Sequence, residues 1–362
     1  MQQYLHTFIG EFRGESVTLF TIYLDYSPIH NSLCVSEFNL ERVVVMTNTI
    51  PSKKAILLLN MGGPNNISEV KVFLSNMFND KRIIGAPKPI RKIISWLITA
   101  SRHKEAEGNY ALLGGKSPIV EHTKRVVTAL SKNVDADVHY IMRYTPPYTS
   151  DVLEPLQGYD EIYAIPLYPH YSQTTTLSSF DVLHEEAHRL GMSGKLKTVD
   201  RYYNDPSYIA SIVERIKESL KEEDPSEFEL IFSAHGLPKK IIENGDLYQR
   251  HIRANVYHAR KALNDAGIYF HKTHLAYQSR LGPLEWIRPY LEDKLASLKK
   301  KKVIIYPIAF TIDNSETEFE LDIEYREKAH HLGIEEYRVA KAPNDHPLFI
   351  TALENLYRSM SS

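Results

Sequence analysis

Strand and helix patterns alternate along almost the whole chain from Lys53 onward, and this alternation constrains the fold more than any other feature. Such alternation produces parallel sheets joined by right-handed crossovers, so the sequence predicts an α/β protein. One helix is well marked, with Asp205 as its N-cap and Pro206 at its first position. The segments predicted to be strands are residues 55–60, 138–144, 162–168, 197–202, 229–233, 271–278 and 303–310.

The run at residues 229–233 ends abruptly in Ser233-Ala234-His235-Gly236-Leu237-Pro238. We therefore expect His235 at the C-terminal end of a parallel strand, the edge where open α/β sheets bind ligands. A histidine there can accept a proton near neutral pH or bind a metal ion. The alternative is a histidine that only forms hydrogen bonds at a strand end.

A line of acids follows the predicted strand at 303–310. Residues 313–325 have the pattern of a helix with an acidic first turn, and Glu316, Glu320 and Glu324 are spaced four apart on one face. Like charges at this spacing are mildly destabilising, although a solvated helix face can carry them. Because the line begins at a strand end, as His235 does, we interpret it as a carboxylate ridge that can bind a divalent cation and carry protons away.

Seven blocks of sequence, in order, resemble the ferrochelatase family, whose members insert ferrous iron into a porphyrin. The resemblance runs from about Lys53 to the C-terminus. The blocks are residues 58–64, 113–118, 143–144, 168–172, 233–238, 278–283 and 316–325.

The resemblance implies two Rossmann-like domains of the class II chelatase type, each a parallel sheet flanked by helices, with an active-site cleft between them. We expect the first domain at residues 51–190 plus 340–362, where the last helix, about 346–359, packs back. The second is expected at residues 191–339. Residues 1–50 are expected to be an N-terminal extension, and our hypothesis is that translation starts at Met46.

The resemblance also implies roles for individual residues. His235 and Glu316 match the catalytic pair, which also holds the metal, and Glu320 and Glu324 extend a proton or metal path. The remaining matches are expected to bind the porphyrin, because a flat apolar disc with carboxylates suits soft apolar side chains and an arginine. They are Met61, Met77, Phe78, Ile83, Arg102, Tyr110, Ser117, Arg143 and Tyr144.

Three departures from family patterns refine these expectations. Many members have a histidine where this chain has Asn314, which cannot relay a proton as imidazole can. Met61 stands where some relatives carry a tyrosine associated with coproporphyrin, which favours protoporphyrin IX as the substrate. Gln173 lies near the position of an internal cluster-binding cysteine. We therefore expect no iron–sulfur cluster and no tightly bound cofactor, with Fe²⁺ as a substrate.

Composition excludes some partners. Lys and Arg number 43 against 45 Asp and Glu, so no basic excess points to nucleic acid. The single cysteine, Cys34, fits a reducing cytoplasm, and no apolar stretch approaches the ~20 residues that span a bilayer. The Ile-rich segment 83–98 contains lysines and arginines; it is either a helix packed on the core or a lip that touches the inner face of the membrane. We expect a monomer.

Three other functions fit parts of the pattern. A porphyrin carrier would use the same apolar surface without needing acids opposite His235. A cobalt-inserting chelatase would keep the acids but would require more basic residues for extra substrate carboxylates. A nucleotide or sugar-phosphate enzyme is disfavoured because the chain has neither GxGxxG nor GxxxxGK[ST].

Overall fold

The computed structural model describes residues 6–8, 20–22, 52–280 and 282–362. The chain divides into two compact units, Met1–Pro51 and Ser52–Ser362. In the first unit, β1 (His6–Phe8) pairs antiparallel with β2 (Phe20–Ile22). The predicted start at Met46 lies outside the described residues.

The second unit contains two four-stranded sheets, and every pairing in them is parallel. The first sheet has the order β4-β3-β5-β6 and the second the order β10-β9-β7-β8. This arrangement confirms the predicted α/β class with two parallel sheets. The strands are β3 (Lys54–Asn60), β4 (Asp137–Met142), β5 (Glu161–Pro166), β6 (Leu196–Thr198), β7 (Phe228–His235), β8 (Lys272–Gln278), β9 (Lys302–Pro307) and β10 (Glu336–Val339).

Alternate residues of β3 face two helical layers. Leu57 and Leu59 pack in a cluster with Leu153 of α4 (Thr149–Leu153) and with α5 (Ser178–Arg189). Ile56 and Leu58 point the other way, toward α3 (Ile119–Leu130) and α11 (Pro347–Ser361). The period-two burial of the strand therefore fixes which helices cover which face.

The second sheet is covered in the same way, and one core joins it to the first. Leu230 and Phe232 of β7 pack with α6 (Pro206–Leu220) and α8 (Tyr248–Asp265), in the same apolar cluster as Ile56. Ile231 faces the opposite layer, formed by α9 (Leu291–Ala296) and α10 (Tyr325–His331). The expected cap of α6 is confirmed, since the Asp205 carboxylate accepts a hydrogen bond from the Tyr208 backbone N–H.

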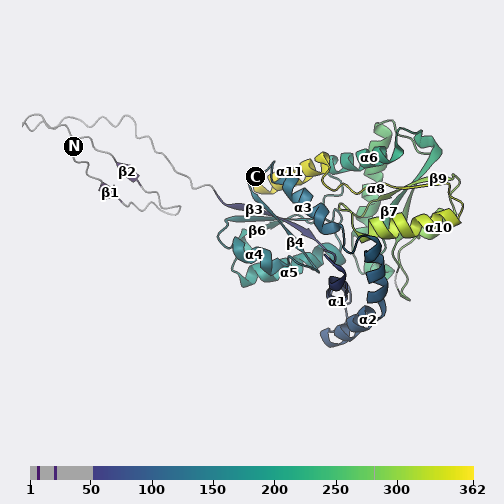
Figure 1. Ribbon diagram of the computed structural model, residues 1–362. Helices are drawn as coiled ribbons and strands as arrows, with labels where there is room; N and C mark the ends of the chain where they lie inside the picture. Colours follow the sequence, from purple (N-terminus) through teal and green to yellow (C-terminus); the bar gives the residue numbers. More distant parts are fainter. Residues whose placement is uncertain (1–5, 9–19, 23–51, 281) are drawn as a thin grey trace, which may run out of the picture. The chain divides into compact units, whose positions relative to one another are not determined.

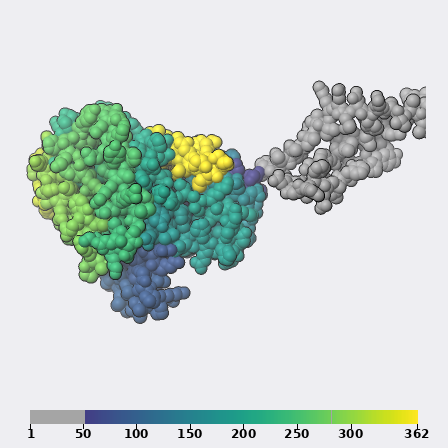
Figure 2. All heavy atoms as spheres, turned by 180° about the vertical axis from the view of Figure 1, so that it is seen from behind, coloured from purple at the N-terminus to yellow at the C-terminus, as the bar shows by residue number. Residues whose placement is uncertain are grey.

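Two helices protrude from this body (Figures 1 and 2). They are α1 (Val70–Phe78) and α2 (Lys88–Leu112), which pack against each other. Only Ser95, Thr99 and Tyr110 of α2 are fully buried. Much of α2 is therefore exposed, including several of its apolar side chains.

The division of the second unit into two domains stays a prediction. Residues 52–362 form one compact unit, and β6, beyond the expected boundary at 190, pairs with β5 of the first sheet. The last helix contacts α3, α6 and β5. The remaining elements are α7 (Lys239–Glu243), the π-helices η3 (Gln173–Leu177) and η6 (Glu316–Glu324), and short 3₁₀ helices at Ile67–Glu69, Glu154–Leu156, Ser193–Lys195 and Pro225–Glu227.

Candidate active site

His235 is the last residue of β7, at the C-terminal edge of the second sheet. Its Nδ1 lies 2.6 Å from the carbonyl oxygen of Gly236. A carbonyl can only accept, so Nδ1 carries the proton and Nε2 of the neutral ring keeps a free lone pair. The Tyr248 hydroxyl donates to the His235 carbonyl at 2.9 Å, and the Trp286 ring lies 6.4 Å from the imidazole, centroid to centroid. The Gly236 carbonyl thus orients the ring and Tyr248 fixes the backbone, while Nε2 has no hydrogen bond among the described residues.

Glu316 faces that lone pair. Its Oε1 lies 3.7 Å from His235 Nε2, and the two side chains are 27% and 31% exposed. Its other oxygen, Oε2, is buried without a hydrogen-bond partner among the described residues. Two acceptors at this separation can share a proton or a cation, because two ligands of one ion lie about 3 Å apart. The sequence prediction that these residues face each other is therefore matched by the geometry.

Glu316 opens η6, and the turn before it is fixed by hydrogen bonds. The Asn314 side-chain oxygen accepts from the Glu316 backbone N–H at 2.8 Å, and the Asn314 amide donates to the carbonyl of Ile312 at 3.0 Å. Asn314, noted for its inability to relay protons, thus stabilises the turn that leads into the helix. The helix is a π-helix rather than an α-helix, a form often found at functional sites, and the residue pattern gave no sign of it.

Glu320 lies behind Glu316 in a polar, partly buried position. The Ser279 hydroxyl lies 2.6 Å from its Oε2, and the Gln278 amide donates to the same oxygen at 3.1 Å. Burial, together with the negative charge of Glu316, raises the pKa of Glu320 to about 7. This carboxyl can therefore gain and lose a proton near neutral pH.

Glu324, the third acid of the predicted ridge, differs from the other two. Its carboxylate forms an ion pair with Lys328 at 2.7 Å, and its side chain is 44% exposed. The ridge therefore runs from the partly buried Glu316 and Glu320 to the more exposed Glu324. The structure places all three acids on one π-helix.

The predicted apolar porphyrin contacts gather in one cluster beside α1 and α2. Phe78 is buried there, and Met61, Met77 and Ile83 are partly buried around it. Tyr110 and Tyr144 belong to the same cluster. The Tyr110 hydroxyl lies 3.2 Å from Ser315 Oγ, next to Glu316, so this cluster adjoins the acidic helix. Burial raises the pKa of Tyr110 to about 12, so the phenol stays protonated.

Arg143 and Tyr144 follow β4, and a residue that sequence reasoning missed holds both. Asp80 is buried, and its Oδ2 accepts from Arg143 Nη2 at 2.8 Å and from the Tyr144 hydroxyl at 3.0 Å. The Ser178 hydroxyl donates to the same oxygen. Burial beside the Asp80 charge raises the pKa of Tyr144. Nothing in the local sequence marks Asp80, because its partners are distant along the chain.

Arg102 and Ser117, the two other polar residues predicted to bind the porphyrin, lie in different surroundings. Arg102 is partly exposed on α2 and forms no hydrogen bond or ion pair with any described residue. Ser117 is buried, and its backbone N–H donates to the Pro64 carbonyl at 2.7 Å. A Cβ added at Gly63 would come within 2.5 Å of Ser117 Oγ, so Ser117 packs directly beneath that loop. Arg102 is free to meet a ligand, whereas Ser117 supports the loop that carries Met61.

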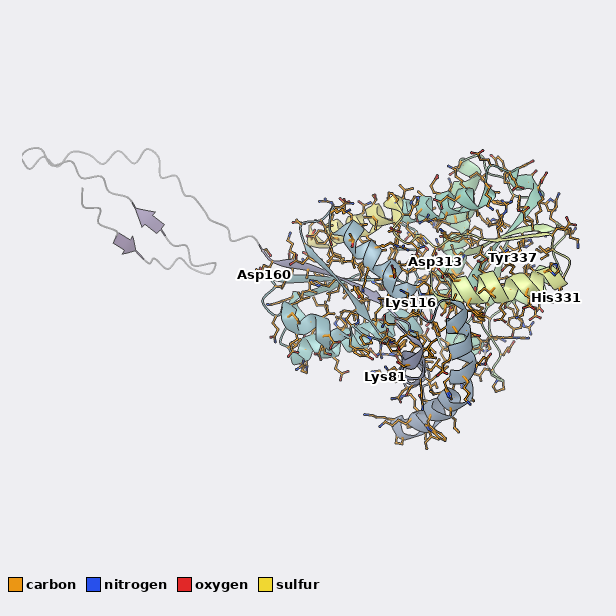
Figure 3. The ribbon with its side chains drawn as sticks, in the orientation of Figure 1. Lys81, Lys116, Asp160, Asp313, His331 and Tyr337 are labelled. Carbon is orange, nitrogen blue, oxygen red and sulfur yellow. The ribbon has the colours of Figure 1, made fainter. Side chains whose placement is uncertain are left out.

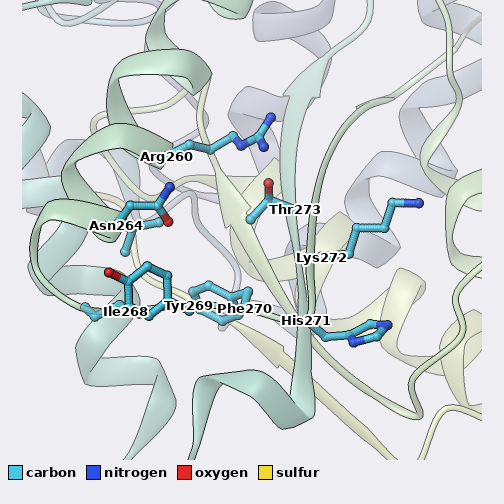
Figure 4. A pocket seen from close by; sticks show the side chains of 9 residues that line it. Arg260, Asn264, Ile268, Tyr269, Phe270, His271, Lys272 and Thr273 are labelled. Carbon is cyan, nitrogen blue, oxygen red and sulfur yellow. The ribbon is translucent and has the colours of Figure 1, made fainter.

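A cavity of about 460 Å³ lies elsewhere (Figure 4). It is formed by the end of α8, the following loop and the first residues of β8, with Arg260, Tyr269 and Lys272 among its lining residues. His235 pairs with Gln278 at the last residue of β8, so this cavity lies at the opposite edge of the sheet. It takes no part in the candidate active site.

The two parallel sheets flanked by helices give the protein the α/β fold of the chelatases. Among solved structures, SirB from Bacillus subtilis with Fe³⁺ superposes with a TM-score of 0.52 at 12% identity, covering 86% of this chain and 96% of that one. That similarity concerns the fold alone.

Sequence comparisons give the particular family. The ferrochelatase family model matches residues 53–361. Ferrochelatase of Sulfurimonas denitrificans is 50% identical over 313 residues, which are 85% of this chain and 99% of the relative. Ferrochelatase of Nitratiruptor sp. is 46% identical over 311 residues, 85% of this chain and 100% of the relative. The chain belongs to the ferrochelatase family, the lyases that insert ferrous iron into a porphyrin in haem biosynthesis.

Proposed function

We propose that this chain inserts Fe²⁺ into protoporphyrin IX, releasing protohaem and two protons, with His235 and Glu316 as the reacting groups. The observation that carries this is the free Nε2 of His235, 3.7 Å from Glu316 Oε1. A free imidazole lone pair can take a pyrrole proton, and imidazole with one carboxylate binds iron loosely enough to release it to the ring. A closed cage of four ligands would retain the metal.

Glu320 and Glu324 serve as the path for protons or metal. Glu320 has a pKa of about 7, so it can accept a proton from the pair and pass it on. Glu324 lies toward solvent beside Lys328. A graded series of acids from an enclosed position to an exposed one suits removal of the two protons that each turnover produces.

The porphyrin is held by the cluster beside α1 and α2. Met61, Met77, Phe78 and Ile83 present apolar surface to the macrocycle, and Arg102, which pairs with no described residue, is available for a propionate. Arg143, Tyr144 and Tyr110 complete the contact set, and Ser117 supports the loop that carries Met61. Tight binding of the rim can supply the roughly 1–5 kcal/mol of strain that bends the ring toward the metal.

The test is anaerobic turnover of Fe²⁺ with protoporphyrin IX, followed through loss of the free-base spectrum. The wild type should metallate the ring, and His235→Ala should lose at least about a hundredfold in kcat, the range for general acid–base catalysis. His331→Ala, an exposed histidine at the end of α10, is the matched control and should match the wild type. Tight porphyrin binding without turnover by the wild type would instead establish a carrier.

Substrate choice is tested with the same assay. Met61 is an apolar, partly buried member of the cluster. A coproporphyrin carries two further carboxylates that this apolar wall does not match, so kcat/KM should be higher for protoporphyrin. Turnover with cobalt and a more highly carboxylated ring alone would support the cobalt chelatase instead.

We also infer that the enzyme works without a resident cofactor. The chain has one cysteine, Cys34, whereas an iron–sulfur cluster needs four protein ligands. Iron and acid-labile sulfide in the purified protein should both be absent at stoichiometric level.

We further infer that the protein is a monomer. Light scattering during gel filtration should therefore give the mass of a single chain.

The exposed face of α2 supports peripheral contact with the membrane from the cytoplasm. Ile93 is 61% exposed and Trp96 is 67% exposed, with the exposed Lys88 and Lys92 on the same helix. Apolar side chains flanked by lysines suit an anionic lipid surface. Among the described residues, no helix is both long and apolar enough to cross a bilayer.

Flotation with vesicles of phosphatidylglycerol and phosphatidylcholine tests this contact. The wild type should float with the vesicles, and the double substitution Ile93→Ser with Trp96→Ser should reduce the floating fraction several-fold. Tyr257→Ser, which removes an aromatic ring that is 65% exposed on α8, should have no effect. Equal flotation of all three proteins would exclude α2 as the contact.

A further inference from the structure

A second cluster of metal-ligating side chains lies away from the His235–Glu316 pair. It consists of His122 on α3, Asp313 in the turn before η6, and Glu318 on η6. One ligand atom from each residue lies within 4.8 Å of the other two. His122 Nε2 and Glu318 Oε1 are 3.6 Å apart. Three candidate ligands thus converge from two separate segments of the chain.

Asp313 is the fixed member of this cluster. It is buried, and its Oδ2 accepts from the Asn344 amide at 2.6 Å while its Oδ1 accepts from the Ala342 backbone N–H at 3.1 Å. Figure 3 labels Asp313 near the middle of the compact unit. Its hydrogen bonds come from neutral groups, and among the described residues it forms no ion pair with a lysine or an arginine. Carboxylates held in this way by hydrogen bonds are typical supports of a metal site.

The other two members are placed to close on an ion. The side chain of His122 is 16% exposed and that of Glu318 is 44% exposed, so ions and water can reach them. Ligands of one ion lie about 3 Å apart, so the cluster must contract by about 1–2 Å, and the exposed glutamate has room to move. Three protein ligands leave positions for water, which makes the ion exchangeable.

We propose that His122, Asp313 and Glu318 form a binding site for a divalent first-row transition metal, separate from the reacting pair. One imidazole and two carboxylates suit Zn²⁺, Fe²⁺, Co²⁺ or Mn²⁺, and they suit Mg²⁺ poorly, because Mg²⁺ prefers oxygen ligands. α3 packs on the first sheet, whereas η6 follows β9 of the second. A bound ion therefore ties the two sheet-bearing parts together beside the helix that carries Glu316.

Arg125 is a built-in competitor for the ion. Its guanidinium donates to His122 Nδ1 and lies 3.4 Å from Nε2. A metal on Nε2 requires the imidazole proton at Nδ1, so Arg125 must release the ring. Its side chain is 50% exposed, and Asp345 lies 4.0 Å away as an alternative partner. Removal of the Arg125 guanidinium should therefore strengthen metal binding. If His122 had only a structural role, this substitution would not change metal affinity.

The test counts Co²⁺ bound in equilibrium dialysis of the full chain. A parent carrying His235→Ala and Glu316→Gln removes the proposed substrate-metal pair, so the remaining binding reports the second cluster. This readout needs no porphyrin turnover, so it stays informative if the proposed function fails. The parent should bind one Co²⁺, and a tenfold excess of Mg²⁺ should not displace it. Crystals soaked in Co²⁺ should show an anomalous peak between the three side chains.

Two added substitutions decide the outcome. His122→Gln in the parent should abolish this Co²⁺ equivalent, with an unchanged thermal midpoint in chelator as the check on folding. Arg125→Gln should tighten binding several-fold. The proposal is wrong if the parent binds no Co²⁺, or if His122→Gln leaves stoichiometry and dissociation constant unchanged.

Discussion

The carboxylate of Asp80 and the guanidinium of Arg143 form an ion pair that is shielded from water on its acidic side. The two charged atoms are 2.8 Å apart, and the Asp80 side chain is 1% exposed against 22% for Arg143. The same carboxylate oxygen also binds the hydroxyls of Tyr144 and Ser178. One buried acid thus fixes both members of the wall that we propose faces the porphyrin.

Asp80→Asn should destabilise the fold and weaken substrate binding. The substitution keeps the shape of the side chain but leaves Arg143 without its counter-charge, and losing one partner of such a pair costs about 2–4 kcal/mol. Urea unfolding should show this loss in the free energy of unfolding. In the metallation assay, KM for porphyrin should rise more than kcat falls, because His235 and Glu316 are untouched.

Asp181→Asn is the matched control for that change. Asp181 pairs with Arg82 at 2.9 Å and with Lys81 at 3.0 Å, and its side chain is 20% exposed. Because solvent screens this pair, its loss should cost much less than the loss of Asp80. If Asp80→Asn and Asp181→Asn lowered the free energy of unfolding equally, burial of the Asp80 carboxylate would not be what makes its ion pair important.

The pKa of Glu320 predicts a pH-dependent stability. Burial and the charge of Glu316 raise this pKa from 4.5 to about 7. Between these values the folded protein holds a proton that the unfolded chain has lost, so stability should fall as pH rises from about 4.5 to about 7. Glu320→Gln should remove that slope and be more stable than the wild type at pH 8, by about 3 kcal/mol at most.

Urea unfolding at intervals from pH 4.5 to pH 8 measures this slope. Glu324→Gln, which alters the solvated acid of the same helix, should leave it in place. Glu320→Gln should also slow metallation without changing porphyrin affinity, if this acid carries protons. An unchanged slope in Glu320→Gln would show that another group titrates in this range.

The sequence was sufficient where a local pattern decides the structure. The strand patterns of the sequence predicted seven strands, and the cap at Asp205 predicted the start of α6, because such patterns and caps depend on neighbours in the chain. His235 was expected at a strand end and is the last residue of β7. Its partner Glu316 was expected opposite, from the family resemblance, and lies 3.7 Å away.

Features that depend on distant residues could not be predicted. Asp80 and Arg143 are 63 positions apart in the sequence, and no periodic pattern of residues predicts a contact between them. The strand β10 was missed because Glu336 and Arg338 interrupt its apolar residues at the edge of the sheet. The π-helical form of η6 and the approach of His122 to Glu318 likewise arise only in the folded chain.

Zinc insertion should accompany iron insertion in vitro. A site of one imidazole and one carboxylate discriminates weakly among Fe²⁺, Co²⁺ and Zn²⁺, because all three accept mixed nitrogen and oxygen ligands. Incubation of the wild type with Zn²⁺ and protoporphyrin IX should give the fluorescence of zinc porphyrin. His235→Ala should suppress the signal, and its complete absence with the wild type would mean that a further feature selects the metal.

Gly63→Ala should damage the loop that carries Met61. The added Cβ would lie 2.5 Å from Ser117 Oγ and 2.6 Å from Ser117 Cβ, and both atoms belong to a buried residue. The resulting overlap should cost about 1–3 kcal/mol of unfolding free energy. Gly108→Ala is the control, since its Cβ meets nothing within 4 Å on α2, and it should stabilise the helix by up to about 1 kcal/mol. Thermal unfolding of the two variants should therefore shift in opposite directions, and a stable Gly63→Ala would mean that Ser117 can move aside.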